Sequence, residues 1–214
     1  MDGNLFFPKI ERRSNYSTKS NGEYYRDYKH YHVEIAEDCN NRCVYCDIKE
    51  NEIGFEGFVL DHFRPQVHFP DLISNPKNLV LSCPKCNILK SDHWAIDIEC
   101  AETHNGICGF LDPFIESRLY YFSIEEDGNL ICIKPLAKYL EKIFLLNRYS
   151  RKKVRYLRII NHKIERIIID ISKKFDFMLS AWNEKKISDA EWKEFCREHN
   201  RKLSLVGSIK SNSQ

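Results

Sequence analysis

The chain has 214 residues, with 33 lysines and arginines against 31 aspartates and glutamates, so its formal net charge is +2. Apolar residues make up 43% of it, and only eight glycines and seven prolines occur, which excludes collagen-like, low-complexity and purely coiled-coil proteins. No apolar run approaches the roughly 18 residues of a membrane span. Residues 1–8 lack the basic and long apolar regions of a signal peptide, so we expect none.

Charge and cysteine are unevenly distributed along the chain. Residues 138–214 carry 19 basic and 9 acidic groups, whereas residues 38–98 carry 6 and 9. A basic C-terminal third suggests a polyanionic partner, and an acidic middle suggests a site for cations. Nine cysteines are an odd number, which argues against a fully paired set of disulfides. Four of them form two CxxC pairs, which favours metal binding in a reducing cytosol.

The N-terminal half reads as short elements. Tyr24, Tyr28, Tyr31 and Ile35 recur at helical spacing, which predicts a helix within residues 23–37. Residues 58–62 are expected to form a strand, and residues 78–82 should lead into the second CxxC pair. A short helix is expected from Asn87 onward. We divide the chain into an N-terminal loop and helix (1–37), a cysteine-rich core (38–98) and a C-terminal region (99–214).

The C-terminal region begins with a predicted hairpin and continues as helices. Two apolar runs within residues 120–133 flank an Asp-Gly-Asn turn, the pattern of a β-hairpin. After Pro135 the chain is expected to be helical, since apolar residues recur in steps of three and four from Val154 to Met178. The sequence Ser188-Asp189-Ala190-Glu191 predicts a capping box that opens a last helix. The tail from Gly207 is expected to fray.

The two CxxC pairs predict a structural zinc site. A CxxC turn places two thiolates on one side of a tight knuckle, and two knuckles supply the four sulfurs that tetrahedral zinc prefers. The pairs are separated by 36 residues: Cys43 and Cys46, then Cys83 and Cys86. Cys39 or Cys100 would be the alternative ligands. The alternative to a metal site is a set of unrelated free thiols.

Three polar positions lie between and just after these pairs. Asp61-His62 ends the predicted strand, Asn78 follows His62 by 16 residues, and Asn87 stands directly after Cys86. Over residues 40–92 this pattern resembles the HNH endonuclease family. The resemblance implies an α+β protein with a zinc-framed ββα-metal (His-Me finger) core. Asn87 stands where many members have histidine, which makes this chain an H-N-N variant.

The chemistry of these side chains agrees with what the resemblance implies. Hydrolysis of a phosphodiester needs a base for the attacking water and a cation that stabilises the developing charge. A histidine side chain can accept the proton of a water molecule, so His62 is the candidate base. Asp61 and Asn87 offer hard oxygen ligands to Mg²⁺ or Mn²⁺. Arg64 and Lys90 are expected to hold oxygens of the substrate phosphate.

The resemblance also gives Asn78 a supporting role, in which it orients the His62 imidazole or stiffens the neighbouring loop. His93 and Asp92 are the next candidates for cation ligands. Eight lysines and arginines lie between Arg148 and Arg166 against one acid, so one face of that helix could follow a phosphate backbone. The alternatives are a solvated face or a face that docks on an acidic protein. No residue set predicts recognition of base edges.

Scattered residues of the C-terminal region resemble nucleases of bacterial anti-phage defence, of which the Septu type works with an ATPase subunit. The sequence therefore predicts a metal-dependent, cytoplasmic endonuclease that acts on nucleic acid, with DNA favoured over RNA. The main alternative is a zinc-ribbon module that binds nucleic acid or protein without catalysis. A third possibility is an interaction subunit whose partner supplies the contacts to DNA.

Overall fold

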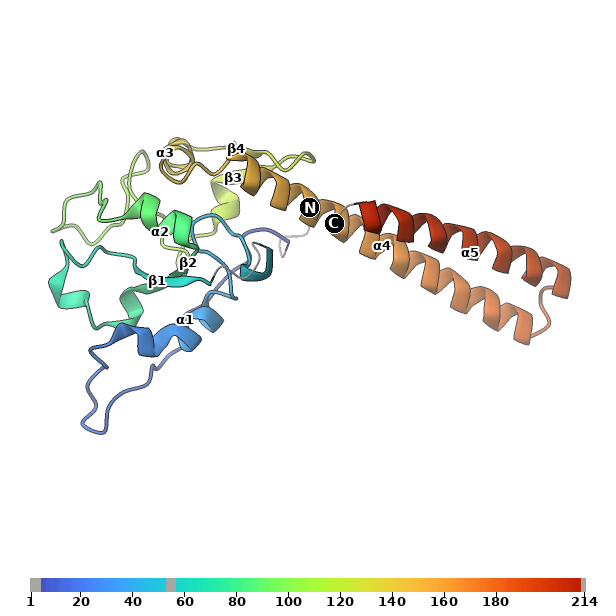
Figure 1. Cartoon of the computed structure of the whole chain (residues 1–214), viewed down its shortest axis with the longest axis horizontal. Coiled ribbons are helices and arrows are strands. Elements are labelled where there is room, and N and C mark those ends of the chain that lie inside the picture. Colours follow the sequence, from blue (N-terminus) through green and yellow to red (C-terminus); the bar gives the residue numbers. More distant parts are fainter. Residues whose placement is uncertain (1–4, 53–56, 213–214) are drawn as a thin grey trace. The chain divides into compact units, whose positions relative to one another are not determined.

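The computed structural model describes residues 5–52 and 57–212, which divide into two compact units with the boundary between Val154 and Arg155 in the sequence (Figure 1). The first unit mixes helices with two small antiparallel hairpins, and the second is helical, so the expected α+β class is confirmed. We based the expectation that there is no signal peptide on residues 1–8, and the first four of these lie outside the described residues. No helix in the described part of the chain is long and apolar enough to cross a membrane.

A ββα element forms the centre of the first unit. Strand β1 (Val59–His62) pairs antiparallel with β2 (Leu79–Ser82), with His62 opposite Leu79, and helix α2 (Pro84–Lys90) follows. Every residue of β2 is buried. Helix α2 begins three residues before the expected Asn87, because Pro84 occupies the first turn, where its missing N–H costs nothing.

The predicted helix within residues 23–37 is shorter than expected. A 3-10 turn spans Tyr28–Tyr31, and helix α1 covers only His32–Asp38. Tyr31 is fully buried, and its hydroxyl accepts from the Tyr25 amide and donates to the Ser17 carbonyl. The ring of Tyr24 packs against Tyr31, whereas the ring of Tyr28 contacts His62. The spacing of these tyrosines therefore reflects separate tertiary contacts rather than one helix that spans all of them.

The second hairpin confirms the expectation for residues 120–133. Strand β3 (Phe122–Ile124) pairs with β4 (Leu130–Cys132), and Gly128 in the turn has φ +81°, a conformation that glycine adopts without strain. Helix α3 (Pro135–Phe144) follows and packs against α2. The remaining short 3-10 turns are Glu50–Glu52, Pro70–Leu72, Pro76–Asn78 and Arg118–Tyr120.

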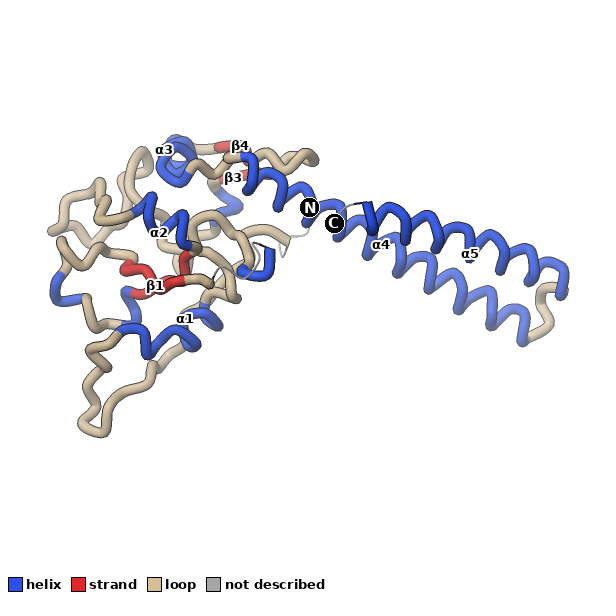
Figure 2. The backbone as a smooth tube through the Cα atoms, in the orientation of Figure 1, coloured by secondary structure: helices blue, strands red, loops and turns tan. Residues whose placement is uncertain are grey.

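Helices α4 (Tyr149–Asn183) and α5 (Asp189–Asn212) run antiparallel and are joined by a short turn (Figure 2). The predicted capping box is confirmed, since the Glu191 carboxylate accepts from the Ser188 amide and the Ser188 hydroxyl accepts from the Glu191 amide. The rings of Trp182 and Trp192 stack between the helices. The expected fraying from Gly207 is wrong, because α5 continues to Asn212. Residues 213–214 lie outside the described part.

Candidate active site and metal centre

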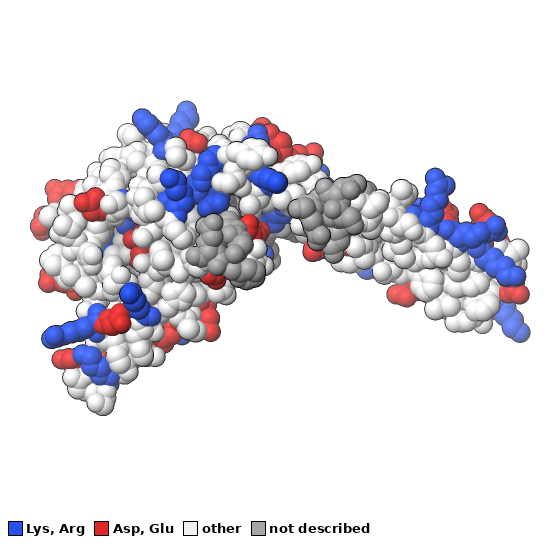
Figure 3. Space-filling model, in the orientation of Figure 1, with Lys and Arg blue, Asp and Glu red and all other residues white. Residues whose placement is uncertain are grey.

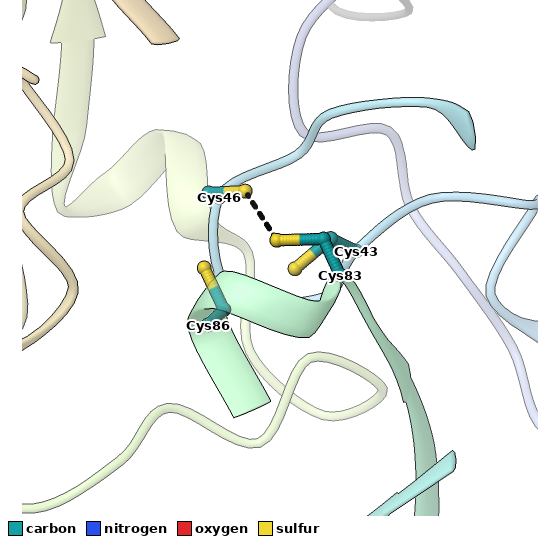
Figure 4. Close-up of side chains that lie close together, drawn as sticks. All are labelled: Cys43, Cys46, Cys83 and Cys86. Carbon is teal, nitrogen blue, oxygen red and sulfur yellow. Dashed lines mark hydrogen bonds between the residues drawn. The ribbon is translucent and has the colours of Figure 1, made fainter. Parts of the chain in front are cut away.

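Four cysteine side chains point toward one another in the first unit (Figure 4). All four are buried: Cys43, Cys46, Cys83 and Cys86. Their sulfur atoms lie within 4.8 Å of one another, and Sγ of Cys46 is 3.8 Å from Sγ of Cys83. Sulfurs bound to a tetrahedral zinc lie about 3.8 Å apart, so the cluster has the dimensions of a zinc site. The four cysteines could therefore hold zinc.

Each CxxC pair sits on a turn that its sequence explains. In the first, the Asp47 amide donates to the Cys43 carbonyl over 2.8 Å, and Asp47 adopts φ +64°. The Arg42 guanidinium, 3.2 Å from the Asp47 carboxylate, pairs with this buried charge. In the second, Cys83 caps the N-terminus of α2 and Pro84 starts the helix. Both turns are thus fixed by local bonds.

The protonation of the four sulfurs is uneven. Burial raises the pKa of the Cys43 thiol, whereas hydrogen bonds from Cys43 and Cys46 hold the pKa of Cys83 well below its usual range. A thiol whose pKa is raised holds its proton more firmly when no cation is bound. A divalent metal would take all four as thiolates and release the protons.

The beginning of α4 brings two guanidinium groups to the cysteines. Nη2 of Arg151 donates to Sγ of Cys83 over 3.4 Å, and Nη2 of Arg148 donates to Sγ of Cys86 over 3.9 Å. Four thiolates around one divalent ion leave an excess of two negative charges, which two arginines can balance.

These contacts correct the expectation for the basic helix. Arg148, Arg151, Arg155 and Arg158 follow steps of three and four, so they share one helix face, and the last three are buried. About half of the predicted phosphate-binding face is therefore unavailable to a polyanion. Of the eight basic residues between Arg148 and Arg166, three are exposed: Lys153, Lys163 and Arg166. Lys173 and Lys174, further along α4, are exposed as well. In Figure 3, basic and acidic side chains intermingle along the α4–α5 hairpin.

A cavity of about 490 Å³ opens beside the ββα element and contains three of the predicted site residues. Asp61 and His62 reach it from the end of β1, and Asn87 reaches it from α2. Its other polar lining comes from Tyr28, Gln66, Ser91 and Asp92. Among the described residues that line the cavity there is no lysine or arginine.

Asp61 is held firmly on one side of its carboxylate. Its Oδ2 accepts from the Tyr45 hydroxyl over 2.6 Å and lies 3.4 Å from Nζ of Lys90. Burial raises the pKa of Asp61, and the nearby Lys90 ammonium opposes that rise. The buried carboxylate is therefore compensated by a hydrogen bond and an ion pair.

His62 is fixed by a backbone carbonyl. Its Nε2 lies 3.0 Å from the Ile73 carbonyl oxygen, and the ring of Tyr28 meets the imidazole edge-on at a centroid distance of 4.8 Å. A carbonyl can only accept, so Nε2 carries the proton and Nδ1 keeps its lone pair in the neutral ring. The imidazole is therefore oriented as an acceptor at Nδ1.

Asn78 does not line the cavity but braces the loop that follows His62. Its Oδ1 accepts from the Arg64 amide over 2.9 Å, and its Nδ2 donates to the Arg64 carbonyl over 3.0 Å. Asn78 is buried, and these two bonds satisfy its polar atoms. The resemblance suggested two roles for Asn78, to orient the His62 imidazole or to stiffen the loop. Both of these hydrogen bonds are made to the loop.

The two predicted phosphate ligands lie elsewhere than expected. The Lys90 side chain has 0% exposure and donates to the His62 carbonyl over 2.8 Å, so solvent does not reach its ammonium. The Arg64 guanidinium lies 5.0 Å from the ring centroids of Phe69 and Trp94 and also donates to the Cys100 and Ala101 carbonyls. Neither side chain lines the cavity.

His93 and Asp92 differ in their placement. His93 bonds to the Tyr139 hydroxyl, away from the cavity, whereas Asp92 lines it. Sequence reasoning missed Tyr45 and Tyr28, which contact Asp61 and His62. Tyr45 could have been found, because it precedes Cys46 inside the first CxxC turn, which folds next to the strand that carries Asp61. Tyr28 had no local signal.

Residues 43–93, which include both CxxC pairs and the cavity residues of β1 and α2, match the family model described as HNH endonuclease. The match confirms the resemblance for this segment of the chain. No solved structure matches the chain.

A second similarity concerns a Septu protein. Over 61 residues the chain is 36% identical to the Septu protein PtuB of Bacillus thuringiensis. The aligned region is 28% of this chain and 23% of that protein. The chain therefore matches less than a quarter of the length of this relative.

Proposed function

We propose that this protein is a metal-dependent endonuclease that hydrolyses phosphodiester bonds of nucleic acid, DNA in preference to RNA. The observation that carries the proposal is the cavity at β1 and α2. It gathers Asp61, His62 and Asn87, and its described lining has carboxylates but no lysine or arginine. The match of residues 43–93 to the HNH endonuclease model supports the same chemistry.

The charge of the cavity argues for a catalytic cation. The cavity already holds the carboxylates of Asp61 and Asp92. Without a cation, these carboxylates would repel the negative charge of a phosphodiester. Carboxylate and amide oxygens are the ligands that Mg²⁺ and Mn²⁺ prefer. We assign the cation to Asp61 and Asn87, which approach the cavity from β1 and α2.

His62 acts as the general base in this proposal. Because its Nε2 proton is directed at the Ile73 carbonyl, Nδ1 is the atom that takes the proton of the attacking water. A bound cation would stabilise the negative charge that develops on the phosphate. Asn78 maintains the loop after His62 and thereby supports the end of β1.

The cysteine cluster serves as the structural frame. We propose that zinc is bound there as a closed four-thiolate site, since the sulfurs have the required spacing and are shielded from solvent. Strand β2 and α2 adjoin the cluster, because the second CxxC pair connects β2 directly to α2. Zinc would therefore stabilise the element that carries the catalytic residues.

The biological setting is proposed from the similarity to the Septu protein PtuB. We place the protein in the bacterial cytoplasm as part of an anti-phage system in which an ATPase subunit is its partner. None of the nine cysteines forms a disulfide in the structure. The exposed basic residues of α4 are the proposed supplementary contacts to nucleic acid.

A cleavage assay tests the proposed function. Purified protein is incubated with supercoiled plasmid and with a structured RNA, in the presence of Mg²⁺, Mn²⁺ or EDTA. The proposal expects nicked or linear plasmid only when a divalent cation is present. Binding of the plasmid without cleavage under every cation condition would instead support the zinc-ribbon module.

A further inference from the structure

We propose that Tyr45 and Lys90 are positioning residues that reserve one oxygen of Asp61, so that the catalytic cation binds to Oδ1 alone. This inference rests on the proposed function, because it takes Asp61 as a cation ligand. The two residues reach Asp61 from different parts of the zinc frame. Tyr45 belongs to the first CxxC turn, and Lys90 ends α2, the helix that begins at the second CxxC pair.

The first contact comes from the first CxxC turn. Tyr45 lies between Cys43 and Cys46 in the sequence, and its hydroxyl donates to Oδ2 of Asp61 over 2.6 Å. Its ring stacks on Phe144 with a centroid distance of 4.5 Å and an interplanar angle of 17°. Packing thus fixes the ring, and the hydroxyl has one direction in which to donate.

The second contact comes from α2. Nζ of Lys90 lies 3.4 Å from the same Oδ2 and donates to the His62 carbonyl over 2.8 Å. Lys90 follows Asn87 by three residues, close to one turn of the same helix. Because it bonds to two consecutive residues of β1, Lys90 also fixes the separation between β1 and the helix that carries Asn87.

These contacts leave the two oxygens of Asp61 in different states. Oδ2 has both donors, whereas no hydrogen bond to Oδ1 occurs among the described residues. A cation at the cavity therefore finds Oδ1 available and Oδ2 shared with a hydroxyl and an ammonium. The carboxylate would act as a single-oxygen ligand, which suits an ion that keeps several waters for its remaining positions.

Removal of the Tyr45 hydroxyl tests the assignment. Mn²⁺ binding is measured by electron paramagnetic resonance in a His62→Ala background, where no substrate is turned over, and cation titrations of plasmid cleavage are run with intact His62. Tyr45→Phe is expected to raise the dissociation constant of Mn²⁺ about tenfold, which corresponds to about 1.4 kcal/mol of binding free energy. The cation concentration for half-maximal cleavage should rise by the same factor, with zinc content unchanged.

Tyr139→Phe is the matched control, because its hydroxyl bonds to His93 and not to Asp61. Equal Mn²⁺ binding by Tyr45→Phe and the parent, or an equal loss in Tyr139→Phe, would overturn the inference. If the wild type nevertheless cleaves plasmid in a cation-dependent way, only this inference fails and the proposed function stands. A tenfold shift in a protein that cleaves neither plasmid nor RNA would support the positioning role and count against hydrolysis.

Discussion

Nη2 of Arg151 lies 3.4 Å from Sγ of Cys83, so the first turn of α4 is bonded to the cysteine cluster. Arg151 is buried, and a buried guanidinium needs a negative partner. A zinc–thiolate centre at the cysteine cluster would supply that partner. The contact joins the proposed zinc site to the residues that begin α4.

Arg151→Met should weaken zinc binding. The substitution keeps most of the apolar stem but removes the charge that balances the thiolates, and groups that bond to metal ligands typically contribute about 10–100-fold to metal affinity. We expect zinc release to a chromogenic chelator to be at least about tenfold faster. Lys153→Met is the control, since Lys153 is exposed on the same helix. Equal release rates in the two variants would contradict the charge-balancing role.

Loss of one cysteine should unfold the frame rather than merely slow the enzyme. Cys43→Ser leaves three thiolates around a buried site, and structural zinc in small domains contributes about 10–16 kcal/mol of apparent binding energy that is coupled to folding. The variant is expected to be zinc-poor and prone to aggregation. Elemental analysis and circular dichroism check this, and a well-folded wild type without zinc would refute the structural role.

The catalytic cation should be removable without loss of zinc. Oxygen-lined sites with two protein ligands bind Mg²⁺-type ions weakly, whereas four thiolates bind zinc tightly. Brief EDTA treatment should therefore abolish cleavage, and Mg²⁺ or Mn²⁺ alone should restore it. Asp61→Ala and Asn87→Ala should each raise the cation concentration that gives half-maximal cleavage. An unchanged requirement in both would direct attention to Asp92, which lines the same cavity.

Asn78→Ala is expected to lower the maximal rate without a change in cation dependence. The side chain makes two bonds to the Arg64 backbone, and a buried group left unsatisfied costs about 1–3 kcal/mol. The free energy of unfolding should fall by a similar amount, which urea denaturation measures. A raised cation requirement with an unchanged maximal rate would place Asn78 among the cation ligands instead.

The features that could be predicted from the sequence are those set by spacing over short distances. The CxxC pairs, the hairpin turn at Gly128 and the Ser188–Glu191 capping box depend on residues a few positions apart, so pattern and structure agree. The tyrosines before α1 also have helical spacing, but Tyr31 is buried and bonds to Ser17, which is distant in sequence. Tertiary packing decides that segment, and no local pattern reveals it.

The basic helix and Lys90 show the second limit of sequence reasoning. A lysine or arginine counts as a surface charge until a buried partner is known. The partners of Arg151 and Lys90 are Cys83 and Asp61, which are separated from them by 68 and 29 residues respectively. The steps of three and four from Arg148 to Arg158 place these arginines on one helix face, but this spacing does not show that the face is buried.

The role of His62 as general base is tested most directly by single-turnover plasmid cleavage in Mn²⁺ by His62→Ala, compared with His68→Ala. His68 bonds to the Asp92 carbonyl and does not line the cavity, so it controls for loss of a histidine. We predict that His62→Ala retains its fold and zinc but loses about 10²–10⁴-fold in rate, whereas His68→Ala stays near the wild type. A His62→Ala rate within a few-fold of the wild type would contradict the assignment of His62 as the base.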